Sequence, residues 1–177
     1  MKQISSFEVL NDDELLSFCN SIIDRASKSE NVSTKNLYFA GPWFSKKAAT
    51  LNDACKKIYN ECKTKSKYKI FFPNDHTFEE PKQAFEEDVN QIHKCDVVVA
   101  MIDDKDVGTA WEIGMAFALN KDIYLLGLDE TSFKRKTNLM LAYTGKCFTL
   151  DKWHKFLTSG LGHDDFVNIN KCWEAIE

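Results

Sequence analysis

The segment whose residues are best suited to catalysis is DVGTAWEIG, residues 106–114. It follows a continuous apolar run and begins a predicted helix, and Gly108 permits a tight turn and the close approach of a ligand. Glu112 falls about one turn into that helix, near its positive end, where the helix dipole helps a carboxylate to stay ionised. Such a carboxylate suits displacement at a sugar carbon, because the transition state there carries oxocarbenium-like charge that a carboxylate stabilises and can bond to.

The same residues are open to plainer interpretations. Glu112 can be a surface acid of the helix, with Asp103, Asp104 and Asp106 forming a solvated loop. A divalent metal held by these aspartates is a third alternative, although the loop lacks the alternating ligand spacing of a calcium site. The residues by themselves leave the three interpretations open, and no metal site is expected.

Two further segments carry candidate site residues. Asp88 lies in the predicted helix AFEEDV, where it flanks the buried stripe or is simply exposed. The segment YFAGPWF, residues 38–44, ends a strand with Trp43 and Phe44, which can stack on a flat heterocycle or belong to the core. The segment has neither GxGxxG nor the lysine of a P-loop, so phosphate binding is not indicated. His76 stands alone in its loop, as a base contact or as an ordinary loop residue.

The elements that must position these residues alternate along the chain. Apolar runs predict strands over residues 37–40, 69–72, 96–102, 122–128 and 147–150. Amphipathic spacing predicts helices over residues 45–63, 81–94 and 108–120, with one or two more helices at the C-terminus. This alternation predicts an α/β fold with a single, doubly wound, mostly parallel five-stranded sheet of the flavodoxin or Rossmann kind, with helices on both faces.

Ligands of such sheets bind in the crevice at the carboxyl ends of the strands. The loops expected to form the site are therefore residues 41–45, 74–80, 103–108 and 129–143.

The N-terminal residues 1–35 are predicted to be an extension in front of the α/β domain of residues 36–177. Asn11 can cap a helix over about residues 12–28, whose first turn is acidic, and residues 27–35 are polar like a linker.

Composition restricts the partners. The chain has 177 residues, enough for one domain with a substantial core, and a net charge of −4, which argues against nucleic acid and favours a small neutral ligand. No apolar stretch is long enough for a membrane span and the N-terminus lacks the pattern of a secretory signal. The six cysteines include no CxxC pair, so we expect them to be reduced and mostly buried in a cytoplasmic protein.

Four motifs, in order, resemble the nucleoside 2-deoxyribosyltransferases: YFAGPWF, EEDVNQIHKCDVVVAMID, DVGTAWEIGMA and TNLMLAY. The resemblance covers about residues 36–150. Each motif alone is weak, but the four in the family's order are specific. The resemblance implies a cofactor-free enzyme of nucleotide salvage that exchanges the bases of 2'-deoxynucleosides with free nucleobases, through a covalent glycosyl-enzyme and with retention of configuration.

The resemblance also implies roles for individual residues. Glu112 matches the family's nucleophile, and Tyr38 the tyrosine that orients it. Asp88 and Asp106 match aspartates near the base and sugar, one of which protonates the leaving base. Asn138 matches an asparagine that reaches the sugar in a neighbouring subunit's site, so a homo-oligomer, a dimer or a hexamer, is implied. The set of substrate-binding residues is then expected to be Gly41, Trp43, Phe44, Asp75, His76, Gly108 and Asn138.

The sequence departs from the family's pattern in three places. Residues 1–35 have no counterpart, the base-contacting D-N-Q loop reads Asn74-Asp75-His76, and the chain continues beyond the point where the family's terminal carboxylate lies. A hydrolase of nucleosides or of deoxynucleoside 5'-monophosphates, using the same Glu112, is the main alternative. Ser45, Lys46 and Lys47 could then hold a phosphate. A non-catalytic nucleotide-sensing domain is the third.

Overall fold

The computed structural model describes residues 34–134 and 138–172. Its sheet consists of β1 (Lys35–Ala40), β2 (Tyr68–Phe71), β3 (Val97–Met101), β4 (Asp122–Gly127) and β5 (Lys146–Thr149). The strands lie in the order β2-β1-β3-β4-β5 and every pairing is parallel. The predicted doubly wound α/β fold is confirmed, and its strand order is the flavodoxin-like one.

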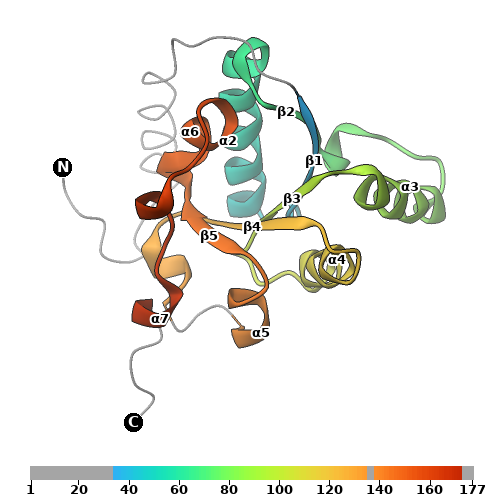
Figure 1. The fold of residues 1–177 in the computed structure, drawn as a ribbon. Helices are drawn as coiled ribbons and strands as arrows, with labels where there is room; N and C mark the ends of the chain where they lie inside the picture. The colour runs from blue at the N-terminus through green and yellow to red at the C-terminus, as the bar shows by residue number, and fades with distance from the viewer. Residues whose placement is uncertain (1–33, 135–137, 173–177) are drawn as a thin grey trace.

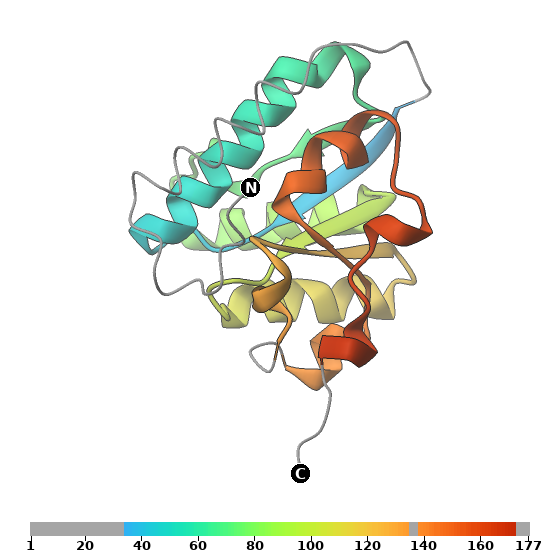
Figure 2. The same ribbon diagram turned by 90° about the vertical axis from the view of Figure 1, so that its left-hand side faces the viewer.

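The helices cover both faces of this sheet (Figures 1 and 2). One face packs on α2 (Lys46–Cys62) and α6 (Trp153–Thr158), and the other on α3 (Pro81–Lys94) and α4 (Val107–Ala118). Short helices α5 (Leu139–Ala142) and α7 (Ile169–Cys172) follow β4 and α6. The predicted helix over residues 12–28 lies outside the described residues, and β1 begins at Lys35, within the predicted linker.

The strand side chains alternate between two cores. Leu37 and Phe39 belong to the cluster beneath α2 and α6, whereas Tyr38 and Ala40 belong to the cluster beneath α3 and α4. All five residues of β3 are buried, as expected for a central parallel strand covered on both faces. The alternation matters for the site, because it directs Tyr38 towards the two helices that carry Asp88 and Glu112.

The connections diverge at the boundary between β1 and β3, which are neighbours in the sheet. The chain leaves β1 for α2 on one face and leaves β3 for α4 on the other. Such a reversal of winding opens a crevice at the carboxyl ends of the two strands, where ligands of this architecture bind.

The structure corrects one part of the sequence prediction and supports another. The predicted loop over residues 129–143 contains a 3₁₀ turn, Glu130–Ser132, and the helix α5, both of which are too short to give a periodic pattern. The expected burial of the cysteines is confirmed within the described residues, where none of them forms a disulfide: Cys55, Cys62, Cys95 and Cys147 are buried, and Cys172 is partly buried.

Candidate active site

A hydrogen bond between β1 and α4 forms the centre of the site. The Tyr38 hydroxyl donates to Glu112 Oε1 over 2.5 Å, although the two residues are 74 positions apart in the chain. The Tyr38 side chain is completely buried, so its position is fixed by the core. The tyrosine therefore orients one carboxylate oxygen of Glu112 and leaves the other available for chemistry.

Burial, rather than the helix dipole, dominates the charge state of Glu112. The pKa of its carboxyl group is raised to about 7, mainly because the group is removed from water; the Tyr38 hydrogen bond opposes this rise, and the charges of Asp88 and Asp106 add to it. The expectation that the helix keeps Glu112 ionised is wrong, because Glu112 is the sixth residue of α4 and lies beyond the turn where the dipole is effective.

Asp88 on α3 approaches the same tyrosine. It lies within hydrogen-bonding reach of the Tyr38 hydroxyl, and burial raises the pKa of its carboxyl group while that hydrogen bond lowers it. Because Tyr38 has one O–H, it can donate to only one of the two carboxylates at a time. When Tyr38 donates to Glu112, a proton on Asp88 lets that side chain donate to the tyrosine oxygen instead.

Asp106 lies at the beginning of α4 as its N-cap residue. Its Oδ2 accepts hydrogen bonds from the Thr109 backbone N–H at 2.6 Å and from Thr109 Oγ1 at 2.9 Å. A Cβ at position 108 would lie 3.0 Å from that oxygen, so Gly108 leaves room for the cap. Asp106 therefore fixes the beginning of α4 and acts on Glu112 through its charge.

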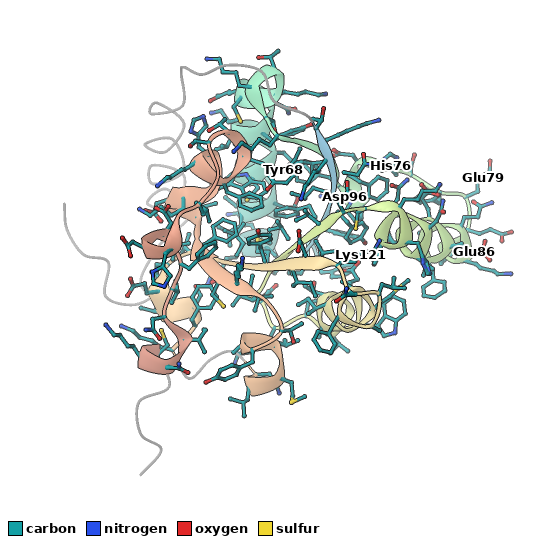
Figure 3. All side chains as sticks on the ribbon, in the orientation of Figure 1. Tyr68, His76, Glu79, Glu86, Asp96 and Lys121 are labelled. Atoms are coloured by element: carbon teal, nitrogen blue, oxygen red, sulfur yellow. The ribbon has the colours of Figure 1, made fainter. Side chains whose placement is uncertain are left out.

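Aromatic rings extend from Tyr38 towards the predicted base loop. Phe71 stacks on Tyr38 with ring centroids 5.8 Å apart, and His76 stacks on Phe71 at 4.5 Å. Figure 3 shows His76 between β1 and α3. The charge of His76 also acts on Asp88. His76 is thus held beside the carboxylates and is not an isolated loop residue.

Other predicted binding residues are engaged in local structure. Asp75 pairs with Lys56 of α2, which ties the loop after β2 to that helix. Asn138 caps α5, its side-chain oxygen accepting from the Met140 N–H at 2.9 Å, and the residue is exposed. Gly41 is buried, and a Cβ there would lie 3.3 Å from Met101 Cβ, so it allows the β1–α2 turn to pack on β3.

Trp43 and Phe44 form a pair at the same turn. Their ring centroids are 5.3 Å apart, and 37% and 79% of their surfaces are exposed. They are therefore not core residues, as one interpretation of the sequence had them. Their exposed rings are available to a ligand in the crevice.

The sequence left Asp103 and Asp104 as acids of a solvated loop or as metal ligands, whereas in the structure each joins two loops by hydrogen bonds. Asp103 accepts from the Leu128 N–H and from Ser132 Oγ, at 2.9 and 2.6 Å, and so joins the loops that follow β3 and β4. Asp104 accepts from Ser45 Oγ at 2.8 Å and joins the loops that follow β3 and β1. The Asp-Asp pair directly after a buried strand was the available signal, but its partners are distant in sequence.

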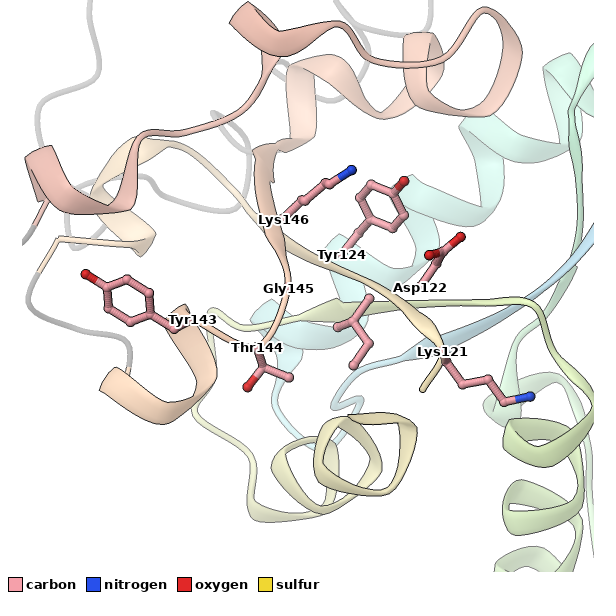
Figure 4. Close-up of a pocket in the computed structure, with 8 residues that line it drawn as sticks. Lys121, Asp122, Tyr124, Tyr143, Thr144, Gly145 and Lys146 are labelled. Atoms are coloured by element: carbon pink, nitrogen blue, oxygen red, sulfur yellow. The ribbon is translucent and has the colours of Figure 1, made fainter. Parts of the chain in front are cut away.

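Residues 121–124 and 143–146 line a pocket of about 270 Å³ at the amino ends of β4 and β5 (Figure 4). It lies at the end of the sheet opposite the crevice, so it is not the expected ligand site of this fold. Its lysines are engaged: Lys121 Nζ donates to the carbonyls of His93 and Cys95, and Lys146 lies over the rings of Tyr124 and Phe166.

Neither a metal centre nor a membrane span occurs in the described part of the chain. Among residues 34–134 and 138–172, no group of three or more His, Cys, Asp or Glu side chains could hold a metal ion. In the same residues, no helix has the length and apolar character that crossing a bilayer requires.

Comparison with known proteins agrees with this arrangement. The sequence model of the nucleoside 2-deoxyribosyltransferase family matches residues 37–150, which contain every residue of the Tyr38–Glu112–Asp88 cluster. No curated protein matches the chain.

Solved structures share the fold at low sequence identity. A 2-deoxyribosyltransferase of Bacillus psychrosaccharolyticus superimposes with a TM-score of 0.54 at 20% identity, over 68% of this chain and 88% of that one. A conserved protein of Enterococcus faecalis gives the same TM-score and identity over 68% and 94% of the two chains. A CMP N-glycosidase of Clostridium botulinum gives a TM-score of 0.49 at 20% identity over 69% and 93%.

Proposed function

Because the chain belongs to the nucleoside 2-deoxyribosyltransferase family, we propose that it transfers the 2-deoxyribosyl group between the bases of 2'-deoxynucleosides, with Glu112 as the covalent nucleophile. The observation that carries the proposal is the 2.5 Å hydrogen bond from the buried Tyr38 hydroxyl to Glu112, with Asp88 at the same hydroxyl. This arrangement supplies an oriented carboxylate, a fixed phenol and a second acid, which are the groups that displacement at a glycosidic carbon needs.

In the first half of the proposed reaction, a Glu112 oxygen attacks C1' of the deoxyribose. The C1'–N bond to the base breaks, and its electron pair goes to the base nitrogen. Asp88 supplies a proton to the leaving base, a role that suits a carboxyl group whose pKa is raised by burial. The product is a glycosyl ester of Glu112 and a free neutral base.

In the second half, a different base attacks C1' from the face that the first base left. The C1'–O bond to Glu112 breaks, the carboxylate is regenerated, and Asp88 takes up the proton that the incoming base loses. Two inversions restore the original configuration. Stacking of the base against the aromatic groups at the crevice, His76 and Trp43 among them, would hold it in place for attack.

The test is base exchange with deoxyinosine or thymidine as donor and adenine as acceptor, followed by chromatography. We expect deoxyadenosine to accumulate, and Glu112→Ala to reduce the rate by several powers of ten, on the order of 5 kcal/mol or more in activation free energy. Glu86→Gln is the matched control, because Glu86 is an exposed acid on the outer side of α3 (Figure 3).

Three results would change the proposal. Free base and deoxyribose without exchange would identify a hydrolase that uses the same nucleophile. An active Glu112→Ala variant would refute the covalent role of Glu112. Binding of nucleosides without any turnover would favour a nucleotide-sensing domain.

We propose further that the enzyme is a homo-oligomer and that Asn138 reaches the site of a neighbouring copy. The outer side of α4 is unusually apolar, with Val107, Trp111 and Phe117 exposed, and Phe85 of α3 packs on Trp111. Several large exposed apolar side chains on two neighbouring helices favour a protein partner. Sedimentation of the full chain should show a dimer or a hexamer, and Trp111→Glu should release monomers. A wild-type monomer at working concentration would refute this part.

The cysteines of the described residues are mostly buried and form no disulfide, which suits a reducing compartment, and we propose that the enzyme works in the cytoplasm. Neither nucleic acid nor a membrane is proposed as a partner, because the net charge of −4 is unfavourable for both.

A further inference from the structure

A side-chain bridge crosses the crevice where the fold places its ligand. Ser45 ends the loop after β1, Asp104 lies in the loop after β3, and Ser45 Oγ donates to Asp104 Oδ2 at 2.8 Å. The two strands are neighbours whose connections leave towards opposite faces of the sheet. The bridge therefore spans the point at which winding reverses, and the loop that carries Asp104 continues directly into α4 and Glu112.

The side of the bridge formed by α2 has the components of an anion site. This 17-residue helix begins after Ser45 and continues with Lys46 and Lys47. The helix dipole makes such a beginning attractive to phosphate, although the Ala48 N–H already donates to Ser45 Oγ at 3.1 Å. The Ser45 hydroxyl and the lysines would add a donor and positive charge.

Carboxylates of the chain itself already occupy this region. Asp104 accepts the Ser45 hydroxyl proton, and Lys47 acts electrostatically on Asp103. Lys47, Asp103 and Asp104 line one narrow cleft together with apolar side chains of α2 and β3. This cleft has no room even for a water molecule, so a phosphate could approach only its mouth, where it would meet two negative charges and a hydroxyl group that is already donating.

We propose that Asp104, held on Ser45 at the beginning of α2, makes the site select uncharged 2'-deoxynucleosides and reject their 5'-phosphates. The inference rests on the proposed function and assigns its substrate class to a particular residue. A 5'-hydroxyl is neutral and can donate to Asp104. A 5'-phosphate carries a charge of about −1.5 to −2 at neutral pH, accepts hydrogen bonds, and is repelled.

The test compares deoxyadenosine with its 5'-monophosphate as glycosyl donor. Asp104→Asn removes the charge and keeps an oxygen that can accept from Ser45, and Asp104→Glu keeps the charge. Asp53→Asn is the matched control, because Asp53 is an exposed acid on the same helix as Ser45. Asp104 is exposed, so these variants should fold, which circular dichroism and thermal unfolding will verify.

We expect the wild-type kcat/KM to favour the nucleoside by about 100-fold or more. Asp104→Asn should reduce this preference about tenfold or more, while Asp104→Glu and Asp53→Asn retain it. High salt should weaken the preference of the wild type and have little effect on that of Asp104→Asn, because the repulsion is screened. Equal use of the two donors by the wild type would overturn the inference, and so would an unchanged preference in Asp104→Asn.

Failure of the proposed function can be distinguished from failure of this inference. If the wild type neither transfers nor hydrolyses, the catalytic proposal fails, and calorimetric titration with the same two compounds decides the inference. Selective binding of deoxyadenosine by the wild type, with gain of monophosphate binding in Asp104→Asn, supports it. Tighter binding of the monophosphate by the wild type overturns it, as does the absence of binding of either compound to both proteins.

Discussion

Replacement of Tyr38 by phenylalanine tests the central geometry of the site. The change removes one hydroxyl group from a completely buried ring and leaves the packing of that ring on Phe71 in place. The lost interaction is the 2.5 Å hydrogen bond to Glu112, which lowers the pKa of a carboxyl group that burial raises to about 7. Tyr38→Phe should therefore make Glu112 harder to ionise.

The size of the effect follows from the type of hydrogen bond. A hydrogen bond to a charged group contributes about 1.5–3 kcal/mol, and about 1.4 kcal/mol corresponds to one pH unit. Because attack requires the carboxylate, kcat/KM of the wild type should rise with pH along an acid limb whose midpoint lies at about pH 7, and it should fall again at higher pH where Asp88 loses the proton that it supplies to the base. In Tyr38→Phe the midpoint of this acid limb should move up by about 1 to 2 pH units, which gives an about 5- to 50-fold lower rate at neutral pH.

The assay is base exchange followed from acidic to alkaline pH in both proteins. Tyr68→Phe is the control, because Tyr68 belongs to the opposite core and stacks on Phe156. An acid limb displaced to higher pH in Tyr38→Phe would distinguish a protonation effect from a general loss of structure. An acid limb at the same pH in the wild type and in Tyr38→Phe would refute the reasoning, as would an equal loss of rate at every pH.

Three further perturbations test the framework of the site. Burial raises the pKa of Asp103 to about 6 from an ordinary 3.8, so the folded protein binds the proton more tightly than the unfolded chain does. The free energy of unfolding should therefore fall by on the order of 1–3 kcal/mol as pH rises from about 4 to about 6. In urea unfolding, this fall should be largely removed in Asp103→Asn, and an unchanged fall in that variant would contradict the reasoning. Lys56→Met should free Asp75 and loosen the base loop, raising KM for the acceptor base by about two- to fivefold with kcat retained; an unchanged KM would mean that the ion pair does not position the loop. A Cβ at position 145 would lie 2.7 Å from the backbone oxygen of Ile123, so Gly145→Ala should lower the free energy of unfolding by about 1–3 kcal/mol. Thermal unfolding measures this loss, and an unchanged Tm would show that β4 and β5 separate easily at this point.

The sequence by itself determined the fold class and most of its elements. The apolar run of β3 is continuous because both faces of a central parallel strand are covered, and helices of three or more turns give clear periodicity. The short helix α5 and the 3₁₀ turn before it were missed, because a single turn has no period to detect. Local chemistry also gave the position of Glu112 at the beginning of a helix after a buried strand.

Only the tertiary structure decided how these residues act on each other. The alternation of β1 turns Tyr38 towards α4 and α3, where it meets Glu112 from 74 residues away and approaches Asp88. The charge state of Glu112 was predicted wrongly, because a sequence reveals a helix dipole but not the desolvation that outweighs it. The same holds for the Ser45–Asp104 bridge, whose partners are 59 residues apart. Hydrogen bonds and desolvation depend on distances of a few ångströms between side chains, and the folded sheet sets those distances.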